Sequence, residues 1–166
     1  YVVRDPGDVE GIARLGPDPL AEEFTRDVLR RILSDAGRSQ IKGVLRHQGT
    51  IAGIGNAYSD ELLHAARLSP FKPANSLNED EFELLYTSIR SVIGEAVERS
   101  RGLAASELKG EKKWNMAVHG RKGEKCPVCG DIVREVSFAD YALQYCATCQ
   151  TGGKPLADRR LSRLLK

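Results

Sequence analysis

The chain has 166 residues, 41% of them hydrophobic, which excludes disordered and fibrous classes and allows one domain or two small ones with a buried core. No apolar run approaches the roughly 20 residues of a membrane span and no secretory signal is evident, so we expect a cytoplasmic protein without membrane contacts. Residues 1–100 carry 12 Lys and Arg against 16 Asp and Glu, a net −4, whereas residues 101–166 carry 13 against 7, a net +6. A basic second half suits a polyanion such as nucleic acid, although it is also a common solubility feature of small domains.

The first part of the chain predicts a series of helices after a connector, residues 1–24, that contains prolines. FTRDVLRRILSD places apolar side chains at helical spacing behind Thr25 as a candidate N-cap. SQIKGVLRHQ and NAYSDELLHAARLSP predict two further helices on either side of the glycine-rich GTIAGIGN. The longest helix is predicted at LNEDEFELLYTSIRSVIGEAVERSRG, where Asn78 fits the N-cap and Gly102 fits the stop. The helical domain is therefore expected to occupy residues 25–102.

Two segments outside the helical domain are rich in basic residues. Residues 103–124 predict a linker, which Trp114 and Met116 are expected to pin to a core. Residues 151–166 mix leucines with arginines after a pair of glycines, which is typical of a short basic amphipathic helix or of a frayed terminus.

All four cysteines of the chain lie within residues 125–150, as Cys126-x2-Cys129 and Cys146-x2-Cys149. A gap of two residues lets both thiolates of one tight turn bind the same ion, and two such turns complete a tetrahedral four-sulfur site that favours zinc. Four thiolates leave no open position for a reactive water. The zinc is therefore expected to be structural.

The residues between the two cysteine pairs partly alternate in polarity and break near Ala139 and Asp140, which predicts a β-hairpin. A unit this small lacks its own apolar core, so metal binding should supply much of its folding free energy. The alternatives are two disulfides, a redox pair, or a variant site in which His119 replaces one thiolate. The apparent cytosolic context disfavours disulfides, and a redox pair does not explain the second Cys-x2-Cys.

The stretch IAGIGNAY predicts a tight reversal that ends at the start of a helix. Backbone N–H groups and the dipole at such a helix start can bind an anion, and Gly53 and Gly55 would allow close backbone approach. Asn56 could cap the helix or donate its amide to a phosphate. The stretch has neither a Walker nor a Rossmann pattern. Taken alone, it is better explained as a connection between helices with glycines at left-handed positions.

Together these motifs resemble the C-terminal half of the Fpg/Nei family of bacterial DNA glycosylases. The resemblance rests on LGPDPL before the helices, IKGVLRHQGTIAGIGNAYSDELL around the turn, HGRKGEKCPVCG entering the cysteine segment and CATCQ ending it. It runs from about Leu15 to Gln150. The chain continues beyond the usual end of the family, which suggests an actinobacterial-like subgroup.

The resemblance implies a mainly α fold, with a helix-two-turns-helix domain followed by a small β-hairpin zinc finger with four cysteines. In the family these two modules clamp double-stranded DNA with a damaged base or an abasic site while the base is flipped out. The phosphate contacts of the family fall on Lys42 of QIK and Asn56 of GIGN. The partner is therefore expected to be damaged DNA in the bacterial nucleoid, bound by a monomer.

The resemblance also implies where the chemistry lies. The family uses an N-terminal proline amine as nucleophile and a neighbouring glutamate as acid, both in a separate N-terminal domain. This sequence begins at Tyr1 without that domain, and Pro6 has no free amine. We therefore expect the DNA-binding half of a bifunctional glycosylase and lyase, without catalytic residues and inert as given.

Two departures from the family pattern bear on DNA binding. The family hairpin usually carries an Arg that approaches a phosphate, followed two positions later by Thr or Ser, but here Tyr141 and Leu143 stand at those places. Arg134 or an arginine of the tail is a candidate replacement. His47 stands where the family often has an acidic residue. These departures favour the endonuclease VIII side of the family.

A competing hypothesis is a non-catalytic zinc-binding adaptor that uses the hairpin and the tail, residues 151–166, to contact a protein partner. A third, an RNA-binding relative of the helical unit, is discouraged by the pairing of GIGN with four cysteines. Salt dependence separates the first two, because phosphate contacts weaken steeply as salt rises and an apolar interface does not.

Overall fold

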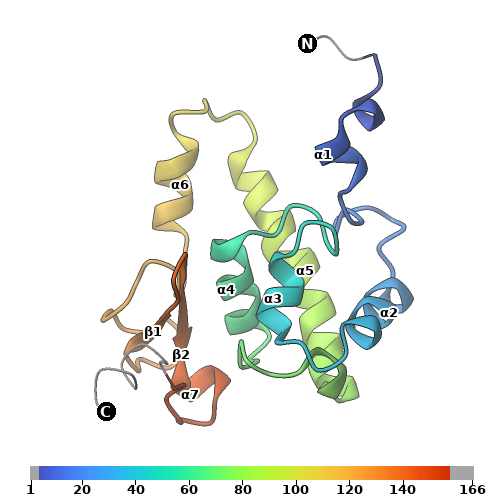
Figure 1. The fold of residues 1–166 in the computed structure, drawn as a ribbon. Coiled ribbons are helices and arrows are strands. Elements are labelled where there is room, and N and C mark those ends of the chain that lie inside the picture. Colours follow the sequence, from blue (N-terminus) through green and yellow to red (C-terminus); the bar gives the residue numbers. More distant parts are fainter. Residues whose placement is uncertain (1–3, 158–166) are drawn as a thin grey trace.

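A computed structural model describes residues 4–157, apart from the side chains of residues 112 and 113. A helical domain lies beside a small hairpin unit, and helix α4 (Asn56–Ala65) stands between the hairpin and the rest of the helical domain (Figure 1). Within the described range no helix is both long and apolar enough to cross a membrane. The predicted tail lies outside the described residues from residue 158 onward.

The elements follow the predicted order. The connector contains two short helices, η1 (Pro6–Asp8) and α1 (Glu10–Ala13). The helical domain consists of α2 (Arg26–Ala36), α3 (Ile41–Arg46), α4, η2 (Ala74–Ser76) and α5 (Glu79–Ser100). The linker contains α6 (Leu108–Trp114), and the finger contains β1 (Val133–Ser137), β2 (Ala142–Cys146) and α7 (Ala147–Gln150). The mainly α fold with a two-stranded finger is therefore confirmed.

Local sequence signals explain where the two amphipathic helices begin. The Thr25 hydroxyl accepts a hydrogen bond from the Val28 N–H, and Asn78 and Glu81 form a reciprocal capping box at the start of α5. Each cap satisfies backbone N–H groups that the helix leaves unpaired, and such caps contribute about 1 kcal/mol. Both predicted N-caps are confirmed.

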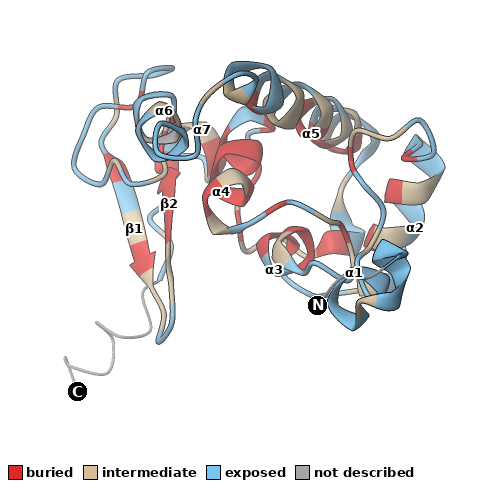
Figure 2. Ribbon diagram, turned by 90° about the horizontal axis from the view of Figure 1, so that it is seen from above, coloured by how far each residue is buried: buried red, intermediate tan, exposed pale blue. Residues whose placement is uncertain are grey.

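The core of the helical domain is formed by the inner faces of α2 to α5, and buried residues gather on α3, α4 and the inner face of α5 (Figure 2). Six of the seven apolar residues at helical spacing along α5 point inward at least in part, whereas the seventh, Val97, is 42% exposed. Helix α5 is 22 residues long, and its C-terminal end extends beyond the core that it covers. The largest fully buried side chains of this core are Phe24, Leu29, Ile41, Leu45, Ile51, Ile54, Leu62, Leu63, Leu85 and Ile89.

The finger is an antiparallel hairpin in which Val133 pairs with Cys146 and Ser137 pairs with Ala142. All but the first residue of β2 are buried, because β2 packs against α4. The finger takes part in only two small apolar clusters, one shared with Val118 of the linker and one with Phe71 of the helical domain. The start of the tail folds back onto this unit, since the Leu156 N–H donates to the Tyr145 hydroxyl at 2.7 Å.

The linker differs from the expectation in two respects, since it forms α6 and only one of its two predicted anchors is buried. Met116 is buried, as predicted, but Trp114 is 84% exposed and does not pin the linker to a core. Trp114 ends α6, and the chain is instead fixed a few residues later, where Glu61 of α4 binds the backbone of residues 117–119. Polar clamping of the backbone replaces the predicted aromatic contact.

Candidate metal centre and nucleic-acid interface

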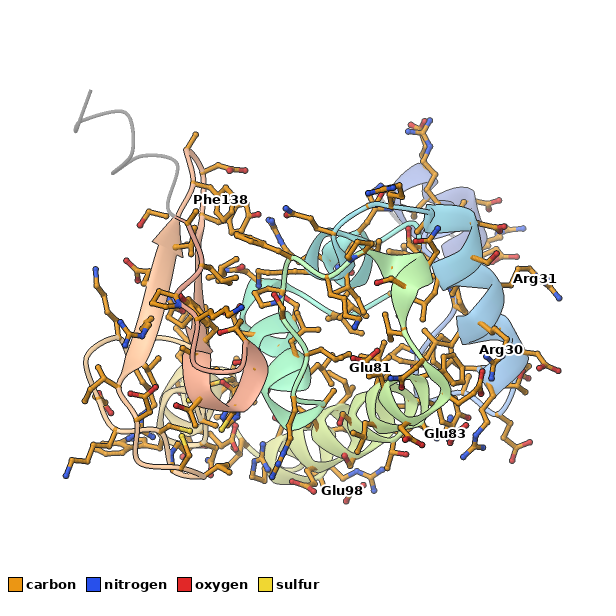
Figure 3. All side chains as sticks on the ribbon, turned by 90° about the horizontal axis from the view of Figure 1, so that it is seen from below. Arg30, Arg31, Glu81, Glu83, Glu98 and Phe138 are labelled. Carbon is orange, nitrogen blue, oxygen red and sulfur yellow. The ribbon has the colours of Figure 1, made fainter. Side chains whose placement is uncertain are left out.

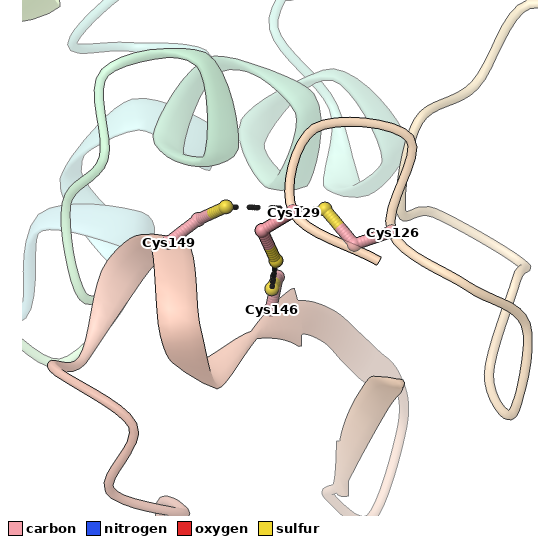
Figure 4. Close-up of side chains that lie close together, drawn as sticks. All are labelled: Cys126, Cys129, Cys146 and Cys149. Atoms are coloured by element: carbon pink, nitrogen blue, oxygen red, sulfur yellow. Dashed lines mark hydrogen bonds between the residues drawn. The ribbon is translucent and has the colours of Figure 1, made fainter. Parts of the chain in front are cut away.

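The four cysteines converge on one point between the two turns of the finger (Figure 4). Their sulfur atoms all lie within 4.8 Å of one another, with Cys126 Sγ 3.9 Å from Cys149 Sγ and Cys129 Sγ 3.4 Å from Cys146 Sγ. A zinc ion with Zn–S bonds of about 2.3 Å in a tetrahedron places its sulfurs about 3.8 Å apart, whereas a disulfide needs about 2 Å. The arrangement fits one zinc ion and no disulfide. Because four sulfur ligands fill the coordination sphere, the zinc is structural.

In the first turn of the finger, backbone hydrogen bonds favour the thiolate form of the two cysteines. A backbone hydrogen bond from Asp131 lowers the pKa of the Cys129 thiol. Burial acts to raise the pKa of Cys126, but backbone hydrogen bonds from Cys129 and Val128 outweigh it, so that this pKa is also lowered. In the second turn burial raises the pKa of Cys146 to about 11 and that of Cys149 further. An ion bound by all four sulfurs would hold them as thiolates.

His64 of α4 extends the metal centre into the helical domain. Its ring is only 5% exposed, and Nε2 lies 3.3 Å from Cys126 Sγ. A zinc-bound thiolate can only accept a hydrogen bond, so Nε2 carries the proton and donates it. Partners of this kind orient a ligand and tune its basicity. His64 therefore ties the position of the zinc site to α4.

We expect His64→Phe to weaken zinc binding about 10- to 100-fold, because it fills similar space but removes the donor to Cys126. Competition with a chromogenic chelator measures this affinity. His47→Phe serves as the control, since His47 is exposed and contacts Thr50 rather than the cysteines. Equal zinc affinity in the two variants would show that the contact with Cys126 does not support the metal.

Glu61 of α4 binds the backbone of the segment that leads into the finger. Oε2 accepts from the Ala117 N–H at 2.7 Å, and Oε1 accepts from the N–H groups of Val118 and His119 at 2.9 Å each. Glu61 is 8% exposed, so three charge-assisted bonds offset the cost of its burial. The geometry fixes the direction in which the chain enters the cysteine segment.

Asp60 and Lys42 form a buried ion pair where the helical domain meets the finger. Their side chains are 1% and 2% exposed, and Lys42 Nζ lies 2.6 Å from Asp60 Oδ1. Nζ also donates to Ser59 Oγ and to the Asn56 carbonyl, which uses all three of its donors. Burial lowers the pKa of Lys42, and the attraction of Asp60 opposes that shift. The remaining oxygen of Asp60 binds His119 Nδ1 and the Gln144 N–H.

This arrangement bears on two residues that the sequence singled out, the predicted phosphate contact Lys42 and the alternative metal ligand His119. Lys42 lies in the interior and has no donor left for a phosphate, so its direct role is to order the start of α4. His119 bonds to Asp60 and is not among the four metal-ligating groups. Lys42 therefore supports the surface on which DNA contacts were predicted, but its own side chain does not reach that surface.

The predicted anion site at the glycine turn is partly occupied by protein groups. Gly53 has a φ of +80°, which favours glycine, and its N–H donates to Gln48 Oε1 at 2.9 Å. Gln48 Nε2 donates to the Ile54 carbonyl, so this one side chain binds backbone groups of two consecutive residues of the turn. Gly55 precedes α4, and none of the described residues accepts a hydrogen bond from the backbone N–H groups of Asn56 or Ala57. Free donors at a helix start remain suited to a phosphate.

Asn56 joins this turn to the finger. Its Nδ2 donates to the Ala142 carbonyl at 2.9 Å, and its Oδ1 has no partner within the described part of the chain. At the two places where the finger departs from the family pattern, Leu143 is fully buried and Tyr141 is half-buried. Arg134, a candidate replacement cation, is exposed on β1.

Sequence reasoning missed the polar face of α4. Asp60 and His64 are four residues apart and therefore share one side of the helix, which is a signal for a polar contact but does not name the partner. Gln150 was also missed: its side chain accepts from the Cys146 N–H and donates to the Leu68 carbonyl, so it links α7 to the loop after α4. These contacts hold the finger and the helical domain in one arrangement.

The fold and the cysteine centre define a helix-two-turns-helix protein with a structural zinc finger. Two family models agree with this definition. The formamidopyrimidine-DNA glycosylase H2TH domain matches residues 15–107, and the zinc finger found in FPG and IleRS matches residues 123–152. The chain belongs to the formamidopyrimidine-DNA glycosylase family, as the resemblance implied; the predicted subgroup stays a prediction.

Two curated relatives illustrate the match. An uncharacterised formamidopyrimidine-DNA glycosylase-like protein of Mycobacterium tuberculosis is 55% identical over 152 residues, which cover 92% of this chain and 94% of that protein. The formamidopyrimidine-DNA glycosylase of Thermus thermophilus is 39% identical over 156 residues, which cover 90% of this chain and 58% of that protein. The chain thus spans nearly all of the first relative but little more than half of the second.

Solved structures of Fpg proteins have a similar fold. The crystal structure of MutM (Fpg) from Thermus thermophilus superposes with a TM-score of 0.77 at 38% identity and covers 92% of this chain and 59% of that one. A Lactococcus lactis Fpg bound non-covalently to DNA containing an abasic site superposes with a TM-score of 0.73 at 32% identity, over 83% of this chain and 51% of that one.

Proposed function

We propose that this chain is the DNA-binding half of a base-excision-repair glycosylase. The helical domain, residues 25–102, and the finger, residues 125–150, grip duplex DNA with a damaged base or an abasic site through its phosphates. The parent protein is proposed to remove oxidised bases and to cleave at abasic sites. No residue of this chain is assigned a catalytic role.

The observation that carries this proposal is the superposition on Fpg in complex with abasic-site DNA over 83% of the chain. A relative superposed to a similar extent is MutM with DNA containing carbocyclic 8-oxo-G. The two family models cover both the helix-two-turns-helix domain and the finger, and the contacts of α4 with the finger hold them in one arrangement. The proposed phosphate contacts are the turn at Gly53 and Gly55 and the side chain of Asn56.

We expect the zinc-loaded chain to bind a duplex with an abasic-site analogue in a strongly salt-dependent way. Counterion release makes the logarithm of the binding constant fall with the logarithm of salt concentration, by about 0.9 for each phosphate neutralised. Asn56→Ala should weaken binding, because it removes an amide at the start of α4. Fluorescence anisotropy with labelled duplexes, damaged and undamaged, measures both effects.

Asn75→Ala is the matched control, since Asn75 is exposed in the short η2 helix. Zinc content and helical circular dichroism should be equal in all three proteins. Binding that is absent at low salt, or that hardly changes with salt, would contradict the proposal. Weak salt dependence together with capture of a protein partner would instead support the adaptor hypothesis.

A further inference from the structure

Arg46 lies where the helical domain faces the tip of the finger. It is the last residue of α3, it is half-buried, and its Cζ lies 3.8 Å from the centroid of the Tyr141 ring. Tyr141 follows the hairpin turn immediately before β2. The contact therefore joins the two modules beside the turn that carries the proposed phosphate contacts.

Tyr141 is itself held by other rings, which together we call the aromatic stack: Tyr141, Phe138 and Phe71. The Tyr141 and Phe138 rings are stacked, with centroids 4.6 Å apart and planes 12° apart. Phe71, in the loop after α4, meets Phe138 edge to face at 6.4 Å. Figure 3 shows Phe138 at the tip of the hairpin. The face on which Arg46 rests is thus fixed from both modules.

Arg46 differs from the two other arginines that lie over aromatic rings. Arg26 lies over Tyr86 but also binds Glu83, and Arg30 lies over Phe82 but also binds Glu79 through two nitrogens. Among the described residues no carboxylate contacts the Arg46 guanidinium. For Arg26 and Arg30 the ring contact accompanies an ion pair. The Arg46 guanidinium lies over the Tyr141 ring without a carboxylate to neutralise its charge.

This geometry leaves the donors of Arg46 available. A guanidinium that lies over a ring makes this contact without using its N–H groups, and their fork matches a phosphate. The Ala142 carbonyl, one residue after Tyr141, binds Asn56 at the start of α4. Arg46 and the start of α4 therefore flank the same finger segment, and Lys42, the other basic residue of α3, is buried.

We propose that Arg46 is a phosphate-binding residue for DNA and that the aromatic stack positions it. The inference rests on the proposed function and assigns the cation that Lys42 cannot supply. Tyr141, which stands in place of a charged residue at the finger tip, contributes indirectly by holding a cation from the helical domain.

The test is binding of the zinc-loaded chain to an abasic-site duplex at several salt concentrations. Arg46→Ala should weaken binding about tenfold at low salt and reduce the salt slope by about 0.9, because one phosphate contact is lost. Tyr141→Ala should weaken binding with normal zinc content, whereas Tyr141→Phe should bind like the wild type because it keeps the ring face. Arg31→Ala is the matched control, since Arg31 is exposed on α2, on the opposite side of the molecule from Phe138 (Figure 3).

The outcomes separate the two claims. Wild-type affinity and salt slope in Arg46→Ala would overturn the inference while leaving the proposed function intact. The same is true if Arg134→Ala, rather than Arg46→Ala, reduces the slope. Loss of affinity equal in Arg31→Ala and Arg46→Ala would also overturn it, because only general charge would then matter. No salt-dependent DNA binding by the wild type would overturn both claims.

Discussion

Removal of zinc is expected to unfold the finger while the helical domain remains folded. The finger has only two small apolar clusters, and without an ion its two cysteine turns lose their bonds to a common centre. Zinc binding of about 10–16 kcal/mol, typical of isolated fingers, is therefore a large part of its folding free energy. The helical domain has a separate apolar core and should retain it.

Hydrogen exchange after chelation measures the effect region by region. Amide protection should be lost in β1 and β2 and retained in α2 and in the inner turns of α5. Cys129→Ser should reproduce the metal-free pattern, whereas Val128→Ala should bind zinc normally, because Val128 is 61% exposed and is not a ligand. Persistent protection of the hairpin without zinc would mean that its packing against α4 is sufficient.

Asp60→Ala is expected to destabilise the zinc-loaded chain by about 3–5 kcal/mol. The substitution leaves Lys42 as a buried charge without its partner, and it also leaves His119 and the Gln144 N–H without an acceptor. Urea unfolding of the zinc-saturated protein, followed by circular dichroism, gives the free energy of unfolding.

The double variant Lys42→Met with Asp60→Ala distinguishes the buried charge from the other lost contacts. Because Met has no charge to bury, this variant should recover part of the stability that Asp60→Ala loses. Glu98→Ala is the control, since Glu98 lies on α5 (Figure 3) and its exposed pair with Arg101 should hardly affect unfolding. An Asp60→Ala variant as stable as this control would contradict the assignment of a buried ion pair.

Local sequence features predicted most of the elements. Helical periodicity and side-chain caps at Thr25 and Asn78 specify α2 and α5 without any tertiary contact, because the groups involved lie within one or two turns. The two Cys-x2-Cys pairs likewise specify the zinc ligands, since each turn brings its own two thiolates together. The resemblance to the glycosylase family added the order of the modules.

The sequence by itself therefore determined the α-helices of the helical domain, the hairpin and the metal ligands, whereas the tertiary structure decided which polar side chains reach the surface and which are buried. A lysine is usually exposed, and nothing near Lys42 in the sequence shows that packing of α3 against α4 encloses it. The contact of His64 with Cys126 spans 62 residues of sequence, and that of Arg46 with Tyr141 joins two modules. Such contacts depend on how the finger docks on α4, which is a property of the assembled core and not of any one segment.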